Sequence, residues 1–123
     1  MKILVVDDST TMRRIISNIL KSSGYDNIVE AGDGVEGLNQ LQANPDVDMV
    51  LTDWNMPNMN GLDFLAKIRE TIPSTKLPVI MVTTEAEKAN VVAAIKAGAN
   101  NYIVKPFTPD IVKTKLEPFL KKD

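Results

Sequence analysis

Apolar residues along the chain fall into two alternating patterns. Five short runs of mostly β-branched apolar residues are typical of strands that are buried on both faces of a parallel sheet. The longer segments between them repeat apolar residues every three or four positions, which indicates helices with one buried face. The predicted strands cover residues 3–6, 28–29, 47–51, 79–82 and 102–104.

Capping and helix-breaking residues mark where the predicted helices begin and end. The first helix follows Ser9 or Thr10, carries apolar residues from Met12 to Leu20, and stops at Gly24. The other four are predicted from Asp33 to before Pro45, from the Asn60-Gly61 turn to before Pro73, from Ala86 to Ala97, and from Thr108-Pro109 to near Glu117, where Pro118 interrupts the helix.

This alternation predicts an α/β fold. Five strands that alternate with five helices through short loops indicate a (βα)5 flavodoxin-like, doubly wound parallel sheet with strand order 2-1-3-4-5. The 123 residues fit one domain, and no linker or repeat divides them. In such sheets ligands bind beyond the carboxyl ends of the strands, so we expect a site near the first and third strands.

Composition excludes several classes of function. Fourteen Lys and Arg against sixteen Asp and Glu give a net charge of −2, which argues against binding nucleic acid through phosphate contacts. The chain has no Cys and no His, and therefore no disulfide, thiolate site or histidine-based catalysis. Its first apolar run has four residues, too few for a signal peptide or a membrane span. We expect a cytoplasmic protein without membrane contact.

Charged residues follow the predicted strands and would meet at one edge of the sheet. Asp7 and Asp8 follow the first strand, Asp53 the third, and Lys105 the fifth. Carboxylates about 4 Å apart repel one another by roughly 4 kcal/mol at an effective dielectric constant near 20. Such a cluster needs a cation, and Lys105 and a divalent ion both qualify. Because the ligands are all oxygen atoms, Mg²⁺ is favoured over Zn²⁺.

Asp53 is the candidate nucleophile. It follows the central strand of the predicted sheet, between the other acids and Lys105, and a carboxylate in that place can accept a phosphoryl group. The Gly32-Asp33-Gly34 segment matches neither a P-loop nor a dinucleotide fingerprint and is interpreted as a turn. The domain is therefore not expected to bind a nucleotide, and the phosphoryl group must come from another donor.

Four segments of the chain resemble the signatures of the bacterial response-regulator receiver domain. They are residues 4–9 (LVVDDS), 52–61 (TDWNMPNMNG), 81–85 (MVTTE) and 104–107 (VKPF). The resemblance covers essentially the whole chain and implies a receiver domain over residues 1–123 with no output domain. Through residues 10–14 (TTMRR) and Tyr102 the chain is most similar to the single-domain chemotaxis regulators of this family.

The resemblance implies a metal site around the phosphoacceptor. Asp53 would accept the phosphoryl group. Asp8, Asp53 and the backbone carbonyl of Asn55 would bind Mg²⁺ directly, and Asp7 would bind it through water. Trp54 would report binding by its fluorescence.

The resemblance also implies how the phosphoryl group is held and sensed. Thr83 would donate a hydrogen bond to it and Lys105, before a cis peptide bond, would pair with it. Glu85, like Asn55, would tune its hydrolysis, and Tyr102 would be the aromatic switch. From the residues alone, Tyr102 is an ordinary strand-end aromatic, and Lys113 and Lys115 lie on the solvated face of the last helix.

The function implied is a signalling switch of a two-component system. A chemotaxis-type histidine kinase would phosphorylate Asp53, and the face formed by the fourth helix, fifth strand and fifth helix would bind the flagellar motor switch. The protein would be a monomer that catalyses only its own phosphorylation and dephosphorylation. Two alternatives stay open: a phosphorelay intermediate, and a Mg²⁺-dependent phosphatase for small molecules. The phosphatase would need a second acid where Asn55 stands and a cap over its substrate.

Overall fold

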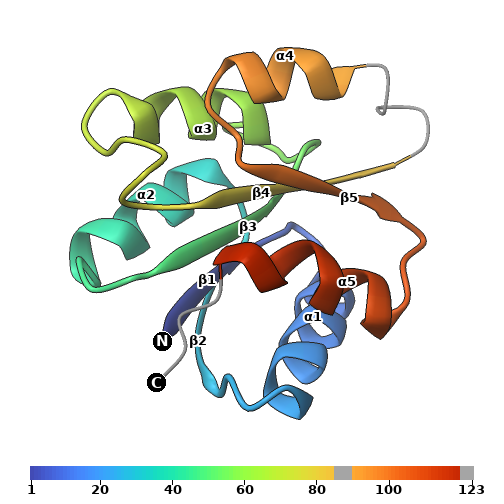
Figure 1. Ribbon diagram of the computed structural model, residues 1–123. Helices are drawn as coiled ribbons and strands as arrows, with labels where there is room; N and C mark the ends of the chain where they lie inside the picture. The colour runs from blue at the N-terminus through green and yellow to red at the C-terminus, as the bar shows by residue number, and fades with distance from the viewer. Residues whose placement is uncertain (85–89, 120–123) are drawn as a thin grey trace.

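Five parallel strands form one sheet between two layers of helices (Figure 1). The computed structural model describes residues 1–84 and 90–119. The elements are β1 (Lys2–Val6), α1 (Thr10–Ser22), β2 (Asn27–Ala31), α2 (Gly34–Ala43), β3 (Met49–Asp53), α3 (Gly61–Arg69), β4 (Val79–Thr84), α4 (Val91–Lys96), β5 (Asn101–Lys105), α5 (Pro109–Leu116) and a 3₁₀ turn, η2 (Glu117–Phe119).

The strand order is β2-β1-β3-β4-β5, so the predicted topology is confirmed. Helices α2, α3 and α4 cover one face of the sheet, and α1 and α5 cover the other (Figure 1). All four strand pairs are parallel. No helix in the described ranges is long and apolar enough to cross a membrane.

Some element boundaries differ from the sequence prediction. β3 begins at Met49, later than predicted, and extends to Asp53. α3 ends at Arg69 instead of reaching Ile72, because the chain tightens into a turn in which Thr71 N–H donates to the Ile68 carbonyl, three residues back, at 3.1 Å. Residues 86–89 of the predicted fourth helix lie outside the described residues. α5 ends before Pro118, as predicted.

Side-chain caps begin four of the helices at the carboxyl edge of the sheet. In each, a side-chain oxygen accepts a hydrogen bond from the backbone N–H three residues later, which satisfies a donor that the helix leaves free. The capping residues are Ser9, Asp33, Asn60 and Thr108. These caps set where the strand-to-helix loops stop, and the loops carry the candidate site residues.

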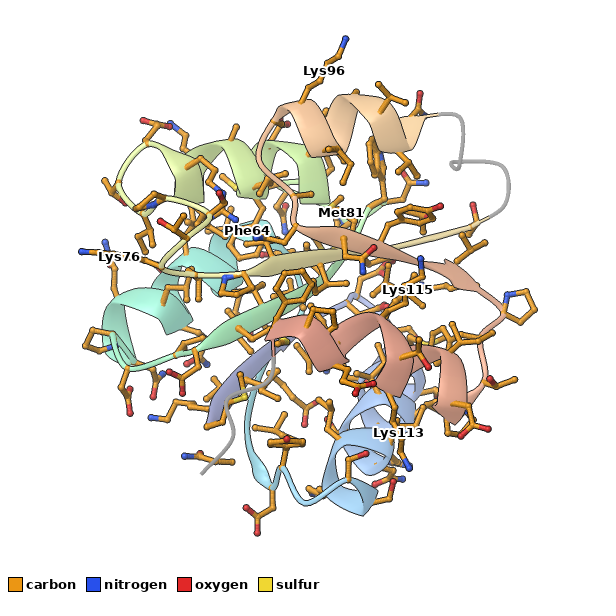
Figure 2. The ribbon with its side chains drawn as sticks, in the orientation of Figure 1. Phe64, Lys76, Met81, Lys96, Lys113 and Lys115 are labelled. Atoms are coloured by element: carbon orange, nitrogen blue, oxygen red, sulfur yellow. The ribbon has the colours of Figure 1, made fainter. Side chains whose placement is uncertain are left out.

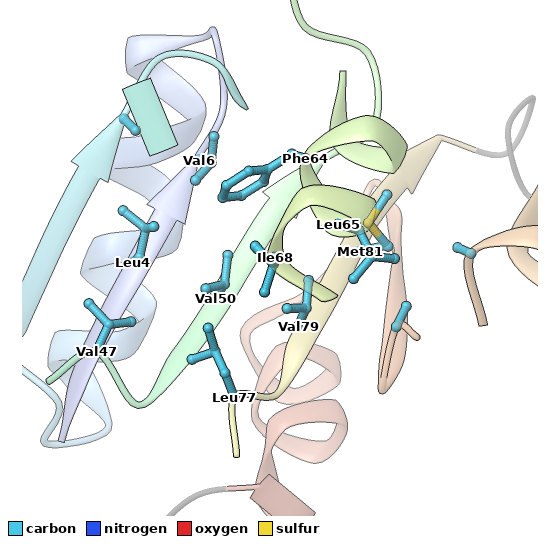
Figure 3. Packing of buried hydrophobic residues seen from close by; sticks show 13 residues of the cluster. Leu4, Val6, Val47, Val50, Phe64, Leu65, Ile68, Leu77, Val79 and Met81 are labelled. Atoms are coloured by element: carbon cyan, nitrogen blue, oxygen red, sulfur yellow. The ribbon is translucent and has the colours of Figure 1, made fainter. Parts of the chain in front are cut away.

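Phe64 is the largest fully buried side chain on the face covered by α2 and α3. It extends from α3 over the sheet toward Val6 and Val50 (Figure 3). A Cβ atom at Gly37 of α2 would lie 2.8 Å from Phe64 Cζ, so glycine at that position lets the ring pack against the α2 backbone. Together these contacts join α2, α3 and the centre of the sheet.

Arg69 fastens the end of α3 to the turn that follows α4. Its Nε atom donates to the Gly98 carbonyl at 3.0 Å, and Nη2 donates to Asn100 Oδ1, also at 3.0 Å. Gly98 has a φ of +109°, in the region that favours glycine. Arg69 thus sets the position of the carboxyl-terminal end of α4.

Truncating Phe64 to Ala should lower the free energy of unfolding by about 3–5 kcal/mol, because the lost ring leaves a cavity between α2, α3 and the sheet. Urea unfolding followed by circular dichroism measures the loss. The matched control is Val92→Ala, since the Val92 residue on α4 is 63% exposed; it should change stability by less than about 0.5 kcal/mol. Equal losses in the two variants would contradict this description of the core.

Candidate functional site

Two carboxylates and one ammonium group meet at the carboxyl edge of the sheet. Asp53 ends β3 and Asp7 follows β1, and they are only 7% and 1% exposed. Lys105 ends β5, and its side chain reaches past β4 to both of them. Its Nζ atom lies 3.3 Å from Asp7 Oδ2 and 3.3 Å from Asp53 Oδ1. The structure therefore brings together three of the predicted site residues from three strand ends.

Asp8 adds a third carboxylate on the solvent side of this cluster. One carboxylate oxygen from each of Asp7, Asp8 and Asp53 lies within 4.8 Å of the others, and Asp8 is exposed where the other two are buried. A group of this composition offers only oxygen ligands, which suits a hard divalent cation. The predicted acidic pocket is present in the fold.

Backbone hydrogen bonds orient both buried carboxylates. Asp7 Oδ1 accepts a hydrogen bond from Ser9 N–H at 2.8 Å, and Asp53 Oδ1 accepts one from Trp54 N–H, also at 2.8 Å. Asp53 therefore makes its contacts with Trp54 and Lys105 through the same oxygen. The other oxygen, Oδ2, takes no part in either contact.

The charges in the cluster do not balance. Burial raises the pKa of Asp53, and the charge of Asp7 raises it further, against the opposing effect of Lys105. Burial by itself lowers the pKa of Lys105, but the charges of Asp53 and Asp7 outweigh burial, so that the pKa of Lys105 is raised. The ammonium group is therefore held in its charged form, while the ionised form of Asp53 is less favoured than in a solvent-exposed aspartate, and an additional cation would stabilise it.

Thr83 carries a hydroxyl group that is buried inside the fold. It lies on β4, one residue beyond Val82, which pairs with Asp53 in the sheet. The residue has no exposed surface, and within residues 1–84 and 90–119 its Oγ1 atom has no hydrogen-bond partner. Buried hydroxyl groups in folded proteins are almost always bonded. Thr83 can therefore donate to a ligand that enters beside Asp53.

Tyr102 lies half-buried on β5 and packs against the apolar cluster under α2, α3 and α4. It pairs with Met81 in the sheet, two residues before Thr83. The Nζ atom of Lys115 on α5 lies 4.4 Å from the centre of its ring, a cation–π contact. Lys113 is exposed, as predicted for a solvated face, and Lys115 is partly exposed because the ring of Tyr102 covers part of it. Figure 2 shows both lysines on α5.

Asn55 lies in the exposed loop between β3 and α3. The loop is closed by a hydrogen bond from Gly61 N–H to the Trp54 carbonyl at 2.8 Å. A Cβ atom at Gly61 would overlap the Asp53 carbonyl, so the loop passes too close to β3 for any other residue there. The Lys105–Pro106 peptide bond is cis, as predicted. Glu85 lies outside the described residues.

Sequence reasoning missed Arg13, which touches the backbone of the site. Its Nη1 atom donates to the Asp7 carbonyl at 2.6 Å, and its Nε atom donates to Glu30 Oε1 on β2 at 3.0 Å. Arg13 thereby ties α1 and β2 to the first strand end. Its spacing from Asp7 carries no such signal, and its contact with Glu30 exists only once β1 and β2 are paired.

Comparison with known proteins agrees with the geometry. Residues 3–117 match the family described as response regulator receiver domain. The chain is 57% identical over 120 residues to chemotaxis protein CheY1 of Helicobacter pylori, covering 98% of this chain and 97% of that protein. A chemotaxis protein CheY homolog of Campylobacter jejuni is also 57% identical, over 98% of this chain and 92% of its own.

Solved structures agree on the fold. The chain in the structure of the CheX-CheY-BeF3-Mg²⁺ complex from Borrelia burgdorferi has a TM-score of 0.89 at 30% identity, with 98% of this chain and 90% of that chain covered. Chemotaxis protein CheY4 of Vibrio cholerae has a TM-score of 0.86 at 34% identity, with 97% and 98% covered. This protein belongs to the response regulator receiver domain family.

Proposed function

We propose that this protein is a chemotaxis switch that a histidine kinase activates by phosphorylating Asp53. The observation that carries the proposal is the position of Lys105 Nζ, 3.3 Å from both Asp7 and Asp53. The buried carboxylate of Asp53 therefore has the ammonium group of Lys105 on one side and the carboxylates of Asp7 and Asp8 on the other. That arrangement suits transfer of a phosphoryl group to a carboxylate.

Mg²⁺ fits the donor set of the acidic cluster. Asp8, Asp53 and the backbone carbonyl of Asn55 would hold the ion directly, with Asp7 holding it through water. When bound, it neutralises negative charge on the transferring phosphoryl group. The pKa of Asp53, raised first by burial and then by the charge of Asp7, supports this assignment, because a second cation would stabilise the ionised carboxylate.

Each residue then has a distinct part in the transfer. An oxygen of Asp53 attacks phosphorus as the bond between phosphorus and the donor breaks, and the donor leaves with the bonding electron pair. Lys105 neutralises an oxygen of the incoming group. The Thr83 hydroxyl donates a hydrogen bond to another oxygen, which gives its buried Oγ1 atom a partner. Turnover is limited to the protein's own phosphorylation and dephosphorylation.

The output surface is the face formed by α4, β5 and α5. It bears the exposed apolar residues Val92, Ile95 and Ile111, and Tyr102 lies beside it. When Thr83 moves toward the phosphoryl group, Tyr102 fills the space it leaves and alters this face. Because the relatives are named as chemotaxis proteins, we assign the flagellar motor switch as the target and the cytoplasm as the compartment. The protein acts as a monomer.

Neither alternative is favoured by the comparisons. The relatives with the highest identity among those described above are chemotaxis proteins over nearly their full length, and none of their names refers to a phosphatase of small molecules or a relay. Asn55 also stands at the position where that phosphatase would need its second acid.

Incubation with acetyl phosphate and Mg²⁺ should label Asp53, as mapped by mass spectrometry after reduction of the acyl phosphate. EDTA should abolish labelling, because the carboxylates then repel the phosphate dianion. Asp8→Asn should slow labelling by roughly tenfold or more through loss of a metal ligand. Asp26→Asn, at an exposed acid in the loop after α1, is the matched control and should label normally. Undiminished labelling of Asp53→Asn would refute the assignment.

Asp53→Asn should stabilise the metal-free protein in a pH-dependent way. Since the pKa of Asp53 is raised by folding, the ionised carboxylate destabilises the folded state. The wild type therefore loses stability as pH rises from the ordinary aspartate pKa through the raised one. The variant escapes this loss, so its melting temperature in EDTA should exceed that of the wild type at neutral pH and match it near pH 3. The opposite order at neutral pH would contradict the charge analysis.

Thr83→Ala should separate phosphorylation from output. Beryllofluoride with Mg²⁺ should still bind at Asp53 and change Trp54 fluorescence in the variant. In the wild type it should also shift the NMR signals of the Ile95 and Ile111 methyl groups. The variant should lose most of that second shift, because the Thr83 hydroxyl couples the site to the output face. Equal methyl shifts in both proteins would mean that another residue carries the coupling.

A further inference from the structure

The loop after the phosphoacceptor is docked onto the start of α2 by two hydrogen bonds. Asn58 Nδ2 donates to Asp33 Oδ2 at 2.7 Å, and Gly34 N–H donates to the Met59 carbonyl at 3.1 Å. The loop and the helix start belong to segments 25 residues apart in sequence. The Gly32-Asp33-Gly34 turn therefore has a contact that its own sequence does not indicate.

Asp33 serves two elements at once. Its Oδ1 atom accepts from Glu36 N–H at 2.8 Å and caps α2, while its Oδ2 atom holds Asn58. The Glu36 N–H and then the Asn58 amide lower the pKa of Asp33, so the carboxylate is ionised near neutral pH. A charge-assisted hydrogen bond is stronger than a bond between neutral groups. The cap of α2 and the position of the loop are thus linked through one side chain.

The fit between loop and helix is close. A Cβ atom at Gly34 would lie 2.7 Å from Met59 Cγ and 2.8 Å from the Met59 carbonyl oxygen. Asn58 has a φ of 66°, and no other non-glycine residue in the described ranges has a positive φ. Asparagine enters this left-handed region more readily than most residues, at a small energetic cost. The loop thus adopts a restricted conformation in which the Asn58 amide meets Asp33.

We propose that Asp33 and Asn58 are a positioning pair that holds residues 54–60 in the conformation that presents the Asn55 carbonyl to the metal. The inference rests on the proposed function. Asp53 and Gly61 fix the two ends of this loop, and the Asp33–Asn58 bond fixes its middle. Without that bond the loop has more conformations to lose when the ion binds, so that binding weakens.

Asn58→Gly tests the bond, because glycine keeps access to the positive φ while the side-chain amide is removed. In the metal-free protein, amide hydrogen exchange at Gly34 should be faster, since its N–H loses the fixed Met59 carbonyl. The dissociation constant for Mg²⁺, followed by Trp54 fluorescence, should rise roughly threefold to tenfold, the net contribution of about one hydrogen bond.

An exchange of the two side chains provides the rescue. Asn58→Asp places two carboxylates against each other and should undock the loop. Adding Asp33→Asn restores a donor and an acceptor with the net charge of the wild type: the introduced amide caps α2 through its oxygen and donates through its nitrogen to the introduced carboxylate. The double variant should regain slow exchange at Gly34 and most of the wild-type affinity for Mg²⁺.

Thr108→Ala is the control for a merely structural effect. It removes the equivalent cap of α5, where Thr108 Oγ1 accepts from Ile111 N–H at 3.2 Å. This variant should lower the melting temperature without altering Mg²⁺ affinity.

Two results would overturn the inference: wild-type affinity and exchange in Asn58→Gly, or a double variant as impaired as Asn58→Asp. If Mg²⁺ left the Trp54 fluorescence of the wild-type protein unchanged, that result would contradict the proposed function instead. Hydrogen exchange at Gly34 would then decide whether Asp33 and Asn58 hold the loop.

Discussion

The site depends on the ion pairs that the ammonium group of Lys105 makes with Asp7 and Asp53. Parallel strands with their carboxyl ends at one edge bring Asp7 and Asp53 together whether or not their charges are compensated. Lys105 lies at 3.3 Å from both and compensates part of that charge. Burial, with the charge of Asp7 added to it, keeps the pKa of Asp53 raised in spite of Lys105. The fold therefore leaves excess negative charge at this edge of the sheet, which a bound cation can neutralise.

The same edge is connected to the far side of β5 through residues on one face of the sheet. Thr83 lies two residues beyond Met81, and Met81 pairs with Tyr102. Lys115 covers the ring of Tyr102 from α5. Tyr102 thus lies on the strand next to Thr83 and contacts α5 through Lys115.

Sequence patterns were sufficient for the topology and for which side chains meet, because both follow from periodicity and from the rule that parallel strands end at one edge. Asp7, Asp8, Asp53 and Lys105 were all predicted on that ground. Contacts between loops were not predictable in this way. The Asp33–Asn58 bond and the bond from Arg13 to Glu30 join segments whose approach is decided by tertiary packing, and neither pattern nor spacing records it.

The partial burial of Lys115 on α5 was also not predictable from the sequence pattern. Its position predicts a solvated side chain, and only the nearby ring of Tyr102 explains why it is partly covered. Element ends were also displaced where turns, and not the helix or strand pattern, decide the boundary, as at Ile72 after α3.

The bonds from Arg69 to Gly98 and Asn100 restrict how α4 is able to move. They hold the carboxyl-terminal end of this helix to α3. Any rearrangement that keeps these bonds is a rotation of α4 about that end, and not a translation along the sheet. Displacement then grows with distance from Gly98 along the helix axis. Val92, one turn further from this pivot than Ile95, would travel the longer path across the output face.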